Sequence, residues 1–409
     1  MGTTKGSTSP ALFPDAVRTE PLKTGILPSQ EIRELISNRK IEALPRIEDS
    51  QVQPASIDLR LGNVAYRVQA SFLPSREATV TAKISDLKLA DLDLTKPMML
   101  ERGAVFVIPV LETLALPHDI SGAANPKSTT GRLDIFTRLV TEGGIGSDPE
   151  DLQFERVPKG YRGRLYVEVV SRTFPIVLSA GAKLTQLRFV RGKPPAETDN
   201  ALERFEQKDG LVYYENGDTP AKAVLSGGLR MSIDLQGSDE SSVVAYRAKR
   251  NCPAVDLSKA GAHDTEKFWD AISAPASKRL VLDPGDFYIL ASKERISVRS
   301  DLAAEMTQFD PSSGEFSAHY AGFFDPGFGY GTAGEIKGTK AVLEVRAHEV
   351  PILLEDRQVV GRLMYHKMAS VPDKLYGQAI GSSYQQQGLA LSKQFRVGAA
   401  NREAATAKR

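Results

Sequence analysis

The chain has 409 residues, of which 41% are hydrophobic and 25% are charged, and its formal net charge at pH 7 is +1. A chain of this length favours two or three domains, and its composition is that of a soluble globular protein. The near-neutral charge argues against nucleic acid or an anionic membrane as the main partner. No apolar run approaches the roughly 18 residues that a membrane span needs.

Cysteine and histidine are too scarce for several common kinds of site. Cys252 is the single cysteine, so an intrachain disulfide and a cysteine-based zinc site are both excluded. The five histidines show no HExxH or similar ligand spacing. Residues 1–24 lack the apolar core of a secretion signal and are typical of a disordered leader. We therefore expect a cytoplasmic protein without zinc.

The predicted elements begin with a helix over 27–40, where apolar residues form one stripe and Ser29 is placed to cap the N-terminus. Alternating apolar residues then predict a strand within 53–68. Residues 98–110 predict strands on either side of a tight turn at Gly103. Short strands with glycine and proline between them indicate a mainly β fold, either a barrel or a compact sandwich.

A polar segment at 123–136 has the composition of a phosphate-binding turn. It offers two cations and three hydroxyls within six residues, which suits a phosphate chain. These residues are Lys127, Ser128, Thr129, Thr130 and Arg132. The GxxxxGK[ST] order of a Walker loop is missing. A solvated surface turn is the alternative interpretation of the same residues.

The chain contains an internal repeat. Segments 163–189 and 339–365 each place a glutamate, Glu168 or Glu344, in the middle of an apolar run, with a proline seven residues later. The four-residue sequence SIDL also recurs, beginning at Ser56 and at Ser232, with the same separation as the two glutamates. Because these words and strands recur in the same order, we interpret the chain as an internal duplication.

The repeated glutamates are candidate functional residues. A carboxylate in a β-branched, apolar run is costly to bury unless it has a partner or a task. Such surroundings also raise a carboxyl pKa, which suits acid–base chemistry. Two alternatives apply to Glu168 and Glu344 alike: a strand glutamate that faces solvent, or a structural ion pair that the duplication copied.

The two copies differ in complementary ways. The second copy has an insertion at 263–274, which contains the sole tryptophan and predicts a short packed helix. The polar turn of the first copy has its counterpart at 309–316, which keeps Ser312 and Ser313 but lacks the basic residue. The second copy alone has an aromatic, glycine-rich hairpin around Asp325, for which ordinary turn chemistry is the alternative interpretation.

Taken together, these motifs resemble a tandem-duplicated dCTP deaminase of the trimeric dUTPase-like superfamily. The motifs are PSQEIRELI, QPASIDLRLG, NPKSTTGRL, FFDPGFGYG, the two glutamate strands and YQQQGLAL. The resemblance extends from about residue 25 to 395 and implies two distorted, mainly antiparallel β-barrels in one chain, with short peripheral helices. The expected parts are a leader (1–24), a first barrel (25–200), a connection (201–228), a second barrel with a closing arm (229–395) and a tail (396–409).

The resemblance also implies site residues. The expected catalytic residues are Ser128, Arg132, Glu168 and Glu344. The expected substrate-binding residues are Lys127, Thr129, Ser312, Ser313, Asp325, Tyr384, Gln386 and Gln387, of which the last three belong to the closing arm. The second copy lacks the arginine after its serines, and the first lacks the hairpin and a clear arm. The sequence therefore leaves open whether the site is composite or one copy is degenerate.

The implied reaction is hydrolytic deamination of dCTP to dUTP and ammonia, with Mg²⁺ held mainly by the triphosphate. One glutamate with a raised pKa can take a proton from water and then deliver one to the leaving amine. Zinc-dependent cytidine deaminases instead use HxE and PCxxC signatures, which a chain with one cysteine cannot supply.

Two other functions remain open at this stage. One is dUTP diphosphatase, or a bifunctional enzyme that carries dCTP through to dUMP, with Asp325 orienting water. The other is a nucleotide-binding regulator without turnover. A homo-oligomer is expected from the resemblance, with dTTP as a candidate ligand besides dCTP and dUTP.

Overall fold

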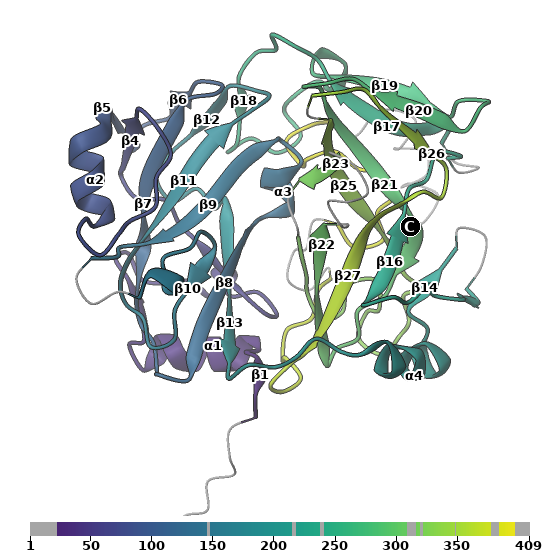
Figure 1. Ribbon diagram of the computed structural model, residues 1–409, viewed down its shortest axis with the longest axis horizontal. Helices are drawn as coiled ribbons and strands as arrows, with labels where there is room; N and C mark the ends of the chain where they lie inside the picture. The colour runs from purple at the N-terminus through teal and green to yellow at the C-terminus, as the bar shows by residue number, and fades with distance from the viewer. Residues whose placement is uncertain are drawn as a thin grey trace, which may run out of the picture.

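The computed structural model describes residues 23–144, 148–214, 218–237, 241–308, 316–319, 322–347, 349–377 and 384–396. Two β-rich units lie side by side, the first purple to teal and the second green to yellow (Figure 1). Each unit is a distorted barrel of antiparallel strands, which confirms the predicted mainly β fold. No helix within these described ranges is long and apolar enough to cross a membrane.

The first unit is built mainly from two sheets around one core, and a third sheet of order β18-β12-β6 joins it to the second unit. One sheet has the order β1-β13-β8-β10 with β3 on β13, and the other has the order β5-β4-β7-β11-β9 with β2 on β7. Its elements are β1 (Gly25–Ile26), α1 (Ser29–Ser37), β2 (Ile41–Ala43), η1 (Asp49–Gln51), β3 (Ile57–Leu59), β4 (Val64–Val68), α2 (Val80–Leu87), β5 (Lys88–Asp93), β6 (Met98–Leu100), β7 (Val105–Ala115), β8 (Ile120–Pro126), α3 (Ser128–Gly131), β9 (Ile135–Thr141), η2 (Pro149–Asp151), β10 (Arg156–Val157), β11 (Arg162–Ser171), β12 (Ile176–Leu178) and β13 (Thr185–Arg191).

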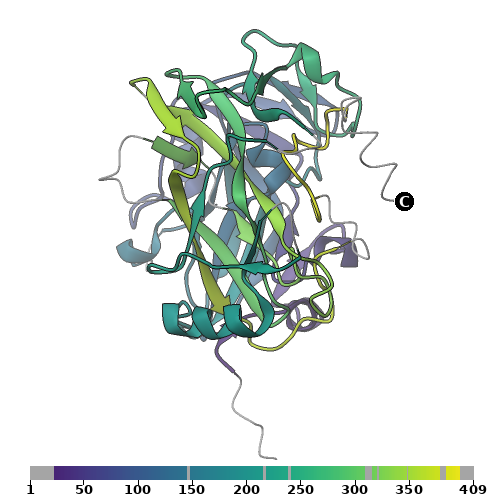
Figure 2. The same ribbon diagram turned by 90° about the vertical axis from the view of Figure 1, so that its right-hand side faces the viewer.

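The second unit has an equivalent pair of sheets. One sheet has the order β15-β14-β21-β17-β19 with β25 on β21 and β23 on β25, and the other has the order β16-β27-β22-β24. Its elements are α4 (Asp199–Asp209), β14 (Val212–Tyr213), β15 (Pro220–Ala221), β16 (Leu229–Ser232), β17 (Val243–Ala248), β18 (Val255–Asp256), η3 (Thr265–Lys267), β19 (Trp269–Ser273), β20 (Arg279–Leu282), β21 (Phe287–Ile296), β22 (Leu302–Gln308), β23 (Phe316–His319), β24 (Phe323–Phe324), β25 (Thr339–Ala347), β26 (Ile352–Glu355) and β27 (Val359–Lys367). Helix α4 lies across the lower end of this unit in both ribbon views (Figure 2).

The two units share apolar packing where they meet. Strand β12 of the first unit pairs in parallel with β18 of the second. Close to this pairing, the ring of Phe174 lies edge-on to those of Phe268, Trp269 and Phe395, with centroids 5.7, 5.4 and 6.3 Å apart. All four rings belong to the core of the first unit. The second unit therefore completes the core of the first, and the two units are held at a fixed orientation.

Three sequence-based expectations are corrected by the structure. The segment 263–274 is not a packed helix. After the short turn η3 it continues as strand β19, because its backbone pairs with that of β17 in antiparallel orientation. Ser29 does not cap the first helix, since Pro28 holds the N-cap position and the Ser29 hydroxyl instead bonds Asp373. The segment 201–228, expected to be a connection, contains most of α4 and contributes buried leucines to the second core.

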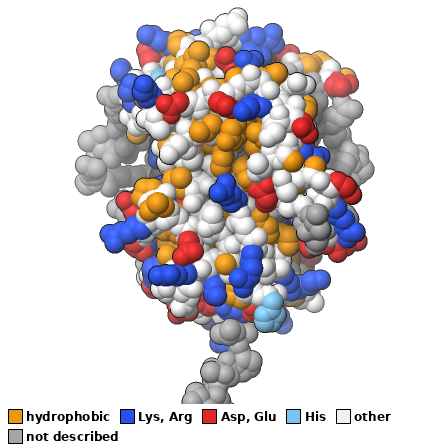
Figure 3. Space-filling model, turned by 90° about the vertical axis from the view of Figure 1, so that its left-hand side faces the viewer, with side chains coloured by type: hydrophobic (Ala, Val, Ile, Leu, Met, Phe, Trp, Pro, Cys, Tyr) orange, Lys and Arg blue, Asp and Glu red, His pale blue; other side chains and the backbone are white. Residues whose placement is uncertain are grey.

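The outer face of the first unit carries a mixed surface. Basic and acidic side chains are interspersed over it, with apolar side chains between them (Figure 3). This distribution accords with the formal net charge of +1 for the whole chain.

Candidate active site

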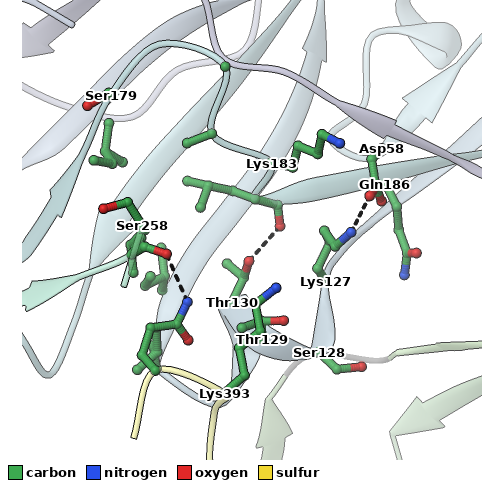
Figure 4. A pocket seen from close by; sticks show the side chains of 18 of the residues that line it. Asp58, Lys127, Ser128, Thr129, Thr130, Ser179, Lys183, Gln186, Ser258 and Lys393 are labelled. Carbon is green, nitrogen blue, oxygen red and sulfur yellow. Dashed lines mark hydrogen bonds and ion pairs between the residues drawn. The ribbon is translucent and has the colours of Figure 1, made fainter. Parts of the chain in front are cut away.

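A polar cavity of about 580 Å³ lies between the two units. The first unit contributes Asp58, Lys127, Ser128, Thr129, Lys183 and Gln186, and the second contributes Asp325, Tyr376, Tyr384 and Lys393. In Figure 4, Lys127 is directed toward Asp58 and Gln186. A smaller cavity of about 50 Å³ shares Ser128, Asp325 and Tyr384 with the larger one and adds Arg132 and Glu344. Some predicted site residues of the two copies thus meet in one place, among them Ser128 and Arg132 of the first and Asp325 and Glu344 of the second.

The predicted phosphate-binding turn forms the floor of this site. Residues Ser128–Gly131 form the single turn α3, and Arg132 occupies its C-cap position. The Thr130 hydroxyl points away from solvent and donates to the carbonyl oxygen of Leu184 at 2.8 Å. Thr130 therefore anchors the turn, which leaves Lys127, Ser128 and Thr129 to face the cavity.

Glu344 lies on β25, on the face of the strand that is turned toward the first unit. Its neighbours Leu343 and Val345 point into the core of the second unit, whereas Val342 packs with the core of the first. Glu344 is 5% exposed, and no described side chain donates a hydrogen bond to its carboxylate. Burial raises its pKa to about 8, and the nearby Arg132 charge partly opposes this rise.

Arg132 is held by the C-terminal arm. Its Nη1 donates to Oε1 of Gln387 at 2.9 Å and to the carbonyl oxygen of Ala390 at 3.0 Å. Its guanidinium carbon lies 3.7 Å from the centroid of the Tyr384 ring. Among the described atoms, Nε of Arg132 and the hydroxyl of Tyr384 are buried without a hydrogen-bond partner. These two groups are therefore left for a ligand.

The hairpin residue Asp325 also faces the first unit. Its Oδ1 lies 3.3 Å from Nη2 of Arg188, whose guanidinium stacks 3.9 Å above the Phe323 ring. Burial raises the pKa of Asp325, and the charge of Arg188 opposes this rise. Beside them Asp58 is ion-paired with Lys127 through Oδ2, while its buried Oδ1 has no partner among the described atoms.

The repeated glutamate of the first unit is elsewhere. Glu168 points to the outer face of its sheet, which the α2 region covers, and its Oε1 accepts a hydrogen bond from Nε of Arg138 at 3.0 Å. It lines neither cavity. Gln386 is exposed and likewise lines neither cavity. Ser312 and Ser313 lie outside the described residues.

Several residues that line the cavities or support them had no place in the predicted site. Asp58 belongs to the repeated word SIDL, so the repeat itself was a usable signal. Tyr376 and Arg188 had no motif to mark them. Gln385 connects the arm to the hairpin, accepting from the backbone of Gly329 at 3.0 Å and donating to the carbonyl oxygen of Gly327 at 2.9 Å.

Fold and site together define a double-barrel protein in which both barrels line two adjoining cavities, the smaller of which contains a buried carboxylate suited to acid–base chemistry. Residues 23–193 match the family model of the 2'-deoxycytidine 5'-triphosphate deaminase N-terminal domain, and residues 198–395 match that of the C-terminal domain. The chain belongs to the dCTP deaminase family and is an enzyme of that family.

Known relatives agree with this assignment. A "dCTP deaminase, dUMP-forming" from Mycobacterium sp. (strain KMS) is 33% identical over 203 residues, covering 48% of this chain and 95% of the relative. A "dCTP deaminase" from Halorubrum lacusprofundi is 29% identical over 177 residues, covering 42% of this chain and 81% of the relative. The crystal structure of 2'-deoxycytidine 5'-triphosphate deaminase from Agrobacterium tumefaciens is 44% identical, with a TM-score of 0.78, over 86% of this chain and all of that one.

Proposed function

We propose that this enzyme deaminates dCTP hydrolytically, with Glu344 as the base and then the acid of the reaction. One observation carries this proposal: Glu344 is a buried carboxylate of the second unit that lines the same small cavity as Arg132 and Ser128 of the first, and no described side chain is ion-paired with it. Its pKa of about 8 lies close to physiological pH. A carboxyl group with such a pKa can exchange a proton in both directions, which a two-step hydrolysis requires.

The proposed reaction uses Glu344 twice. Its carboxylate accepts a proton from water as the oxygen adds to C4 of cytosine. The carboxyl group passes this proton to N3 of the ring, and it then accepts the proton of the new C4 hydroxyl and donates it to the amine, which leaves as ammonia while the C4 carbonyl forms. Proton transfer of this kind typically contributes about 10²- to 10⁴-fold in rate. Positioning of the base by Arg132, Ser128 and the arm would supply the remainder.

The polar turn of the first unit is the proposed binding site of the triphosphate. Lys127, Ser128 and Thr129 present a cation and two hydroxyls to the larger cavity. Charge-assisted hydrogen bonds from such groups suit phosphate oxygens. Lys183 and Lys393 line the same cavity and add positive charge. The arm would then close over the nucleotide through Tyr384 and Gln387.

Magnesium is the proposed cofactor, carried mainly by the triphosphate. The described residues contain no group of three or more His, Cys, Asp or Glu side chains that could hold a metal ion by themselves. A Mg²⁺ ion bound by phosphates typically needs one or two protein carboxylates in addition. Asp58 fits this need, because its buried Oδ1 has no partner and the residue lines the cavity. When bound, the ion would neutralise phosphate charge.

A bifunctional enzyme that releases dUMP is the second candidate. Several relatives are named as dUMP-forming, among them the one from Mycobacterium sp.. Asp325 lines both cavities and could orient a second water molecule toward the phosphate chain. We therefore propose Asp325 as the residue on which phosphate cleavage would depend, if the enzyme carries it out.

Product analysis tests the proposal. The purified protein is incubated with Mg²⁺ and dCTP, dUTP or dCMP, and ammonia and nucleotides are followed by a coupled assay and anion-exchange chromatography. Ammonia and dUTP from dCTP would support the deaminase alone, and dUMP with pyrophosphate would support the bifunctional enzyme. Tight nucleotide binding without any turnover would contradict both and favour a regulator.

A further inference from the structure

A second buried charge pair joins the two units directly beside Arg132 and Glu344. Asp134 follows Arg132 by two residues, and Arg346 follows Glu344 by two residues on β25. Side chains two residues apart on a strand lie on the same face, so Glu344 and Arg346 both face the first unit. In the first unit the positive Arg132 precedes the negative Asp134, whereas in the second unit the negative Glu344 precedes the positive Arg346. Each unit therefore presents two charges of opposite sign, and each of them faces an opposite charge on the other unit.

The Asp134–Arg346 contact is buried and bridged by a hydroxyl. The side chain of Asp134 is fully buried, and Nη2 of Arg346 is ion-paired with its Oδ2. Nη2 also donates to Oγ1 of Thr173 at 2.8 Å, and that hydroxyl donates to Oδ2 of Asp134 at 2.6 Å. Nη1 of Arg346 donates to the carbonyl oxygen of Gly285. Three other segments of the chain thus converge on one guanidinium group of β25.

Asp134 is also part of the turn that carries Arg132. Its backbone N–H donates to the carbonyl oxygen of Gly131 at 2.9 Å, and its own carbonyl oxygen accepts from the N–H of Arg172 at 3.0 Å. Its φ of 54° lies in the left-handed region, which a residue with a Cβ keeps only where its surroundings hold it. The ion pair with Arg346 is one of the contacts that hold Asp134 in this conformation.

A second link between Arg132 and β25 runs through Gln387, which accepts from Arg132 and donates to the carbonyl oxygen of Lys340 at 3.2 Å. This link reaches the strand backbone four residues before Glu344 and does not contact the Glu344 carboxylate. Arg132 is bound to the arm through Gln387 and Ala390, and the Glu344 carboxylate receives no hydrogen bond from a described side chain. A further buried pair between the units, Arg188 with Asp325, connects β13 to the hairpin and not to β25.

We propose that the Asp134–Arg346 pair, bridged by Thr173, is a positioning device that sets the register of β25 against the α3 turn and so places Glu344 relative to Arg132. This inference rests on the proposed function of Glu344. The three residues do not line either cavity, so they act through Arg132 and Glu344 and not on the nucleotide.

The test separates positioning from ordinary stabilisation. Asp134→Asn, Arg346→Lys and Thr173→Val are compared with wild type for kcat and KM in ammonia release from dCTP, and for Tm. The matched control is Arg138→Lys, which weakens the buried pair with Glu168 away from the cavities. We expect Asp134→Asn and Arg346→Lys to lower kcat by roughly 10- to 100-fold with KM within about threefold, because small misplacements of reacting groups have effects of this size. The control should lower Tm alone.

Three results would overturn or support the inference. A kcat within about threefold of wild type, with a lowered Tm like that of the control, would overturn it, since such a pair would be only structural. If Asp134→Asn does not fold, Thr173→Val decides, because it removes only the bridging hydroxyl: a kcat lowered about three- to tenfold supports the inference and an unchanged kcat overturns it. An active wild type with unaffected variants rejects the positioning role alone, whereas a wild type without ammonia release rejects the proposed function as well.

Discussion

Glu168 is ion-paired with Arg138 on the neighbouring strand, and the guanidinium of that arginine lies 3.7 Å from the centroid of the Phe154 ring. The equivalent glutamate of the second unit, Glu344, has no such partner among the described side chains and lies in a cavity. The difference follows from what covers each strand: the α2 region covers β11, whereas the first unit covers β25. The same motif therefore has a structural role in one unit and a proposed catalytic role in the other.

Glu168→Gln should lower stability and leave activity almost unchanged. Arg138 would lose its charged partner, which typically costs about 1–3 kcal/mol for a buried group and less here, because this arginine is partly exposed. Chemical denaturation measures the free energy of unfolding, and ammonia release from dCTP measures activity. A loss of activity without a loss of stability would show that Glu168 takes part in catalysis.

The stability of the ligand-free enzyme should fall as pH rises from about 4.5 to about 8. The pKa of Glu344 is raised from 4.5 to about 8 in the folded state, so the folded chain binds this proton more tightly than the unfolded chain does. Its stabilising effect is complete below the unfolded pKa and is lost as pH passes through the folded one. Burial raises the pKa of Glu155 in the same sense, so the wild type must be compared with Glu344→Gln.

That comparison isolates the contribution of Glu344. The free energy of unfolding is measured at several pH values for both proteins, and the difference between the two curves should narrow or change sign across the window. A difference that is constant with pH would mean that Glu344 titrates normally in the folded protein.

Arg132→Met should shift the pH dependence of activity. The Arg132 charge lowers the pKa of Glu344, so its removal should raise that pKa further and move the acidic limb of kcat/KM to higher pH. We expect a rate loss of about 10²-fold or more at pH 7, because positioning is lost as well. Lys183→Met is the control: this cation lines the larger cavity alone, so KM should change and the pH profile should not.

Adjacent glutamines of the arm should differ in importance. Gln387 accepts a hydrogen bond from Arg132 and donates to the carbonyl oxygen of Lys340 at 3.2 Å, whereas Gln386 is exposed. Gln387→Ala should therefore lower kcat/KM about tenfold, which corresponds to about 1.4 kcal/mol for a hydrogen bond to a charged group. Gln386→Ala should stay within about twofold of wild type. Equal effects at both positions would show that the arm contributes through its backbone.

The sequence was sufficient for the class of fold, and it also drew attention to several residues that line the two cavities, because both depend on local patterns. Alternating apolar residues predicted the strands, and the hydroxyl-rich turn and the arm were recognisable from their motifs. Which glutamate faces the cavity was not predictable, since it depends on how the units pack against each other. Strand β19 was not predictable either, because pairing with its partner strand decides its conformation. The Asp134–Arg346 pair was not predictable because its members lie far apart in the sequence and meet only when the units pack. The internal duplication, the homo-oligomer and the cytoplasmic location stay predictions.

The most direct measurement is ammonia release from dCTP by Glu344→Gln, with Glu168→Gln assayed in parallel. Glutamine keeps the shape of the side chain but cannot accept and return the proton, so the first variant should lose about 10²- to 10⁴-fold in kcat while it still binds the nucleotide. The second variant should keep the wild-type rate. A Glu344→Gln enzyme that retains full activity, or one whose loss is matched by Glu168→Gln, would contradict a composite site with Glu344 at its centre.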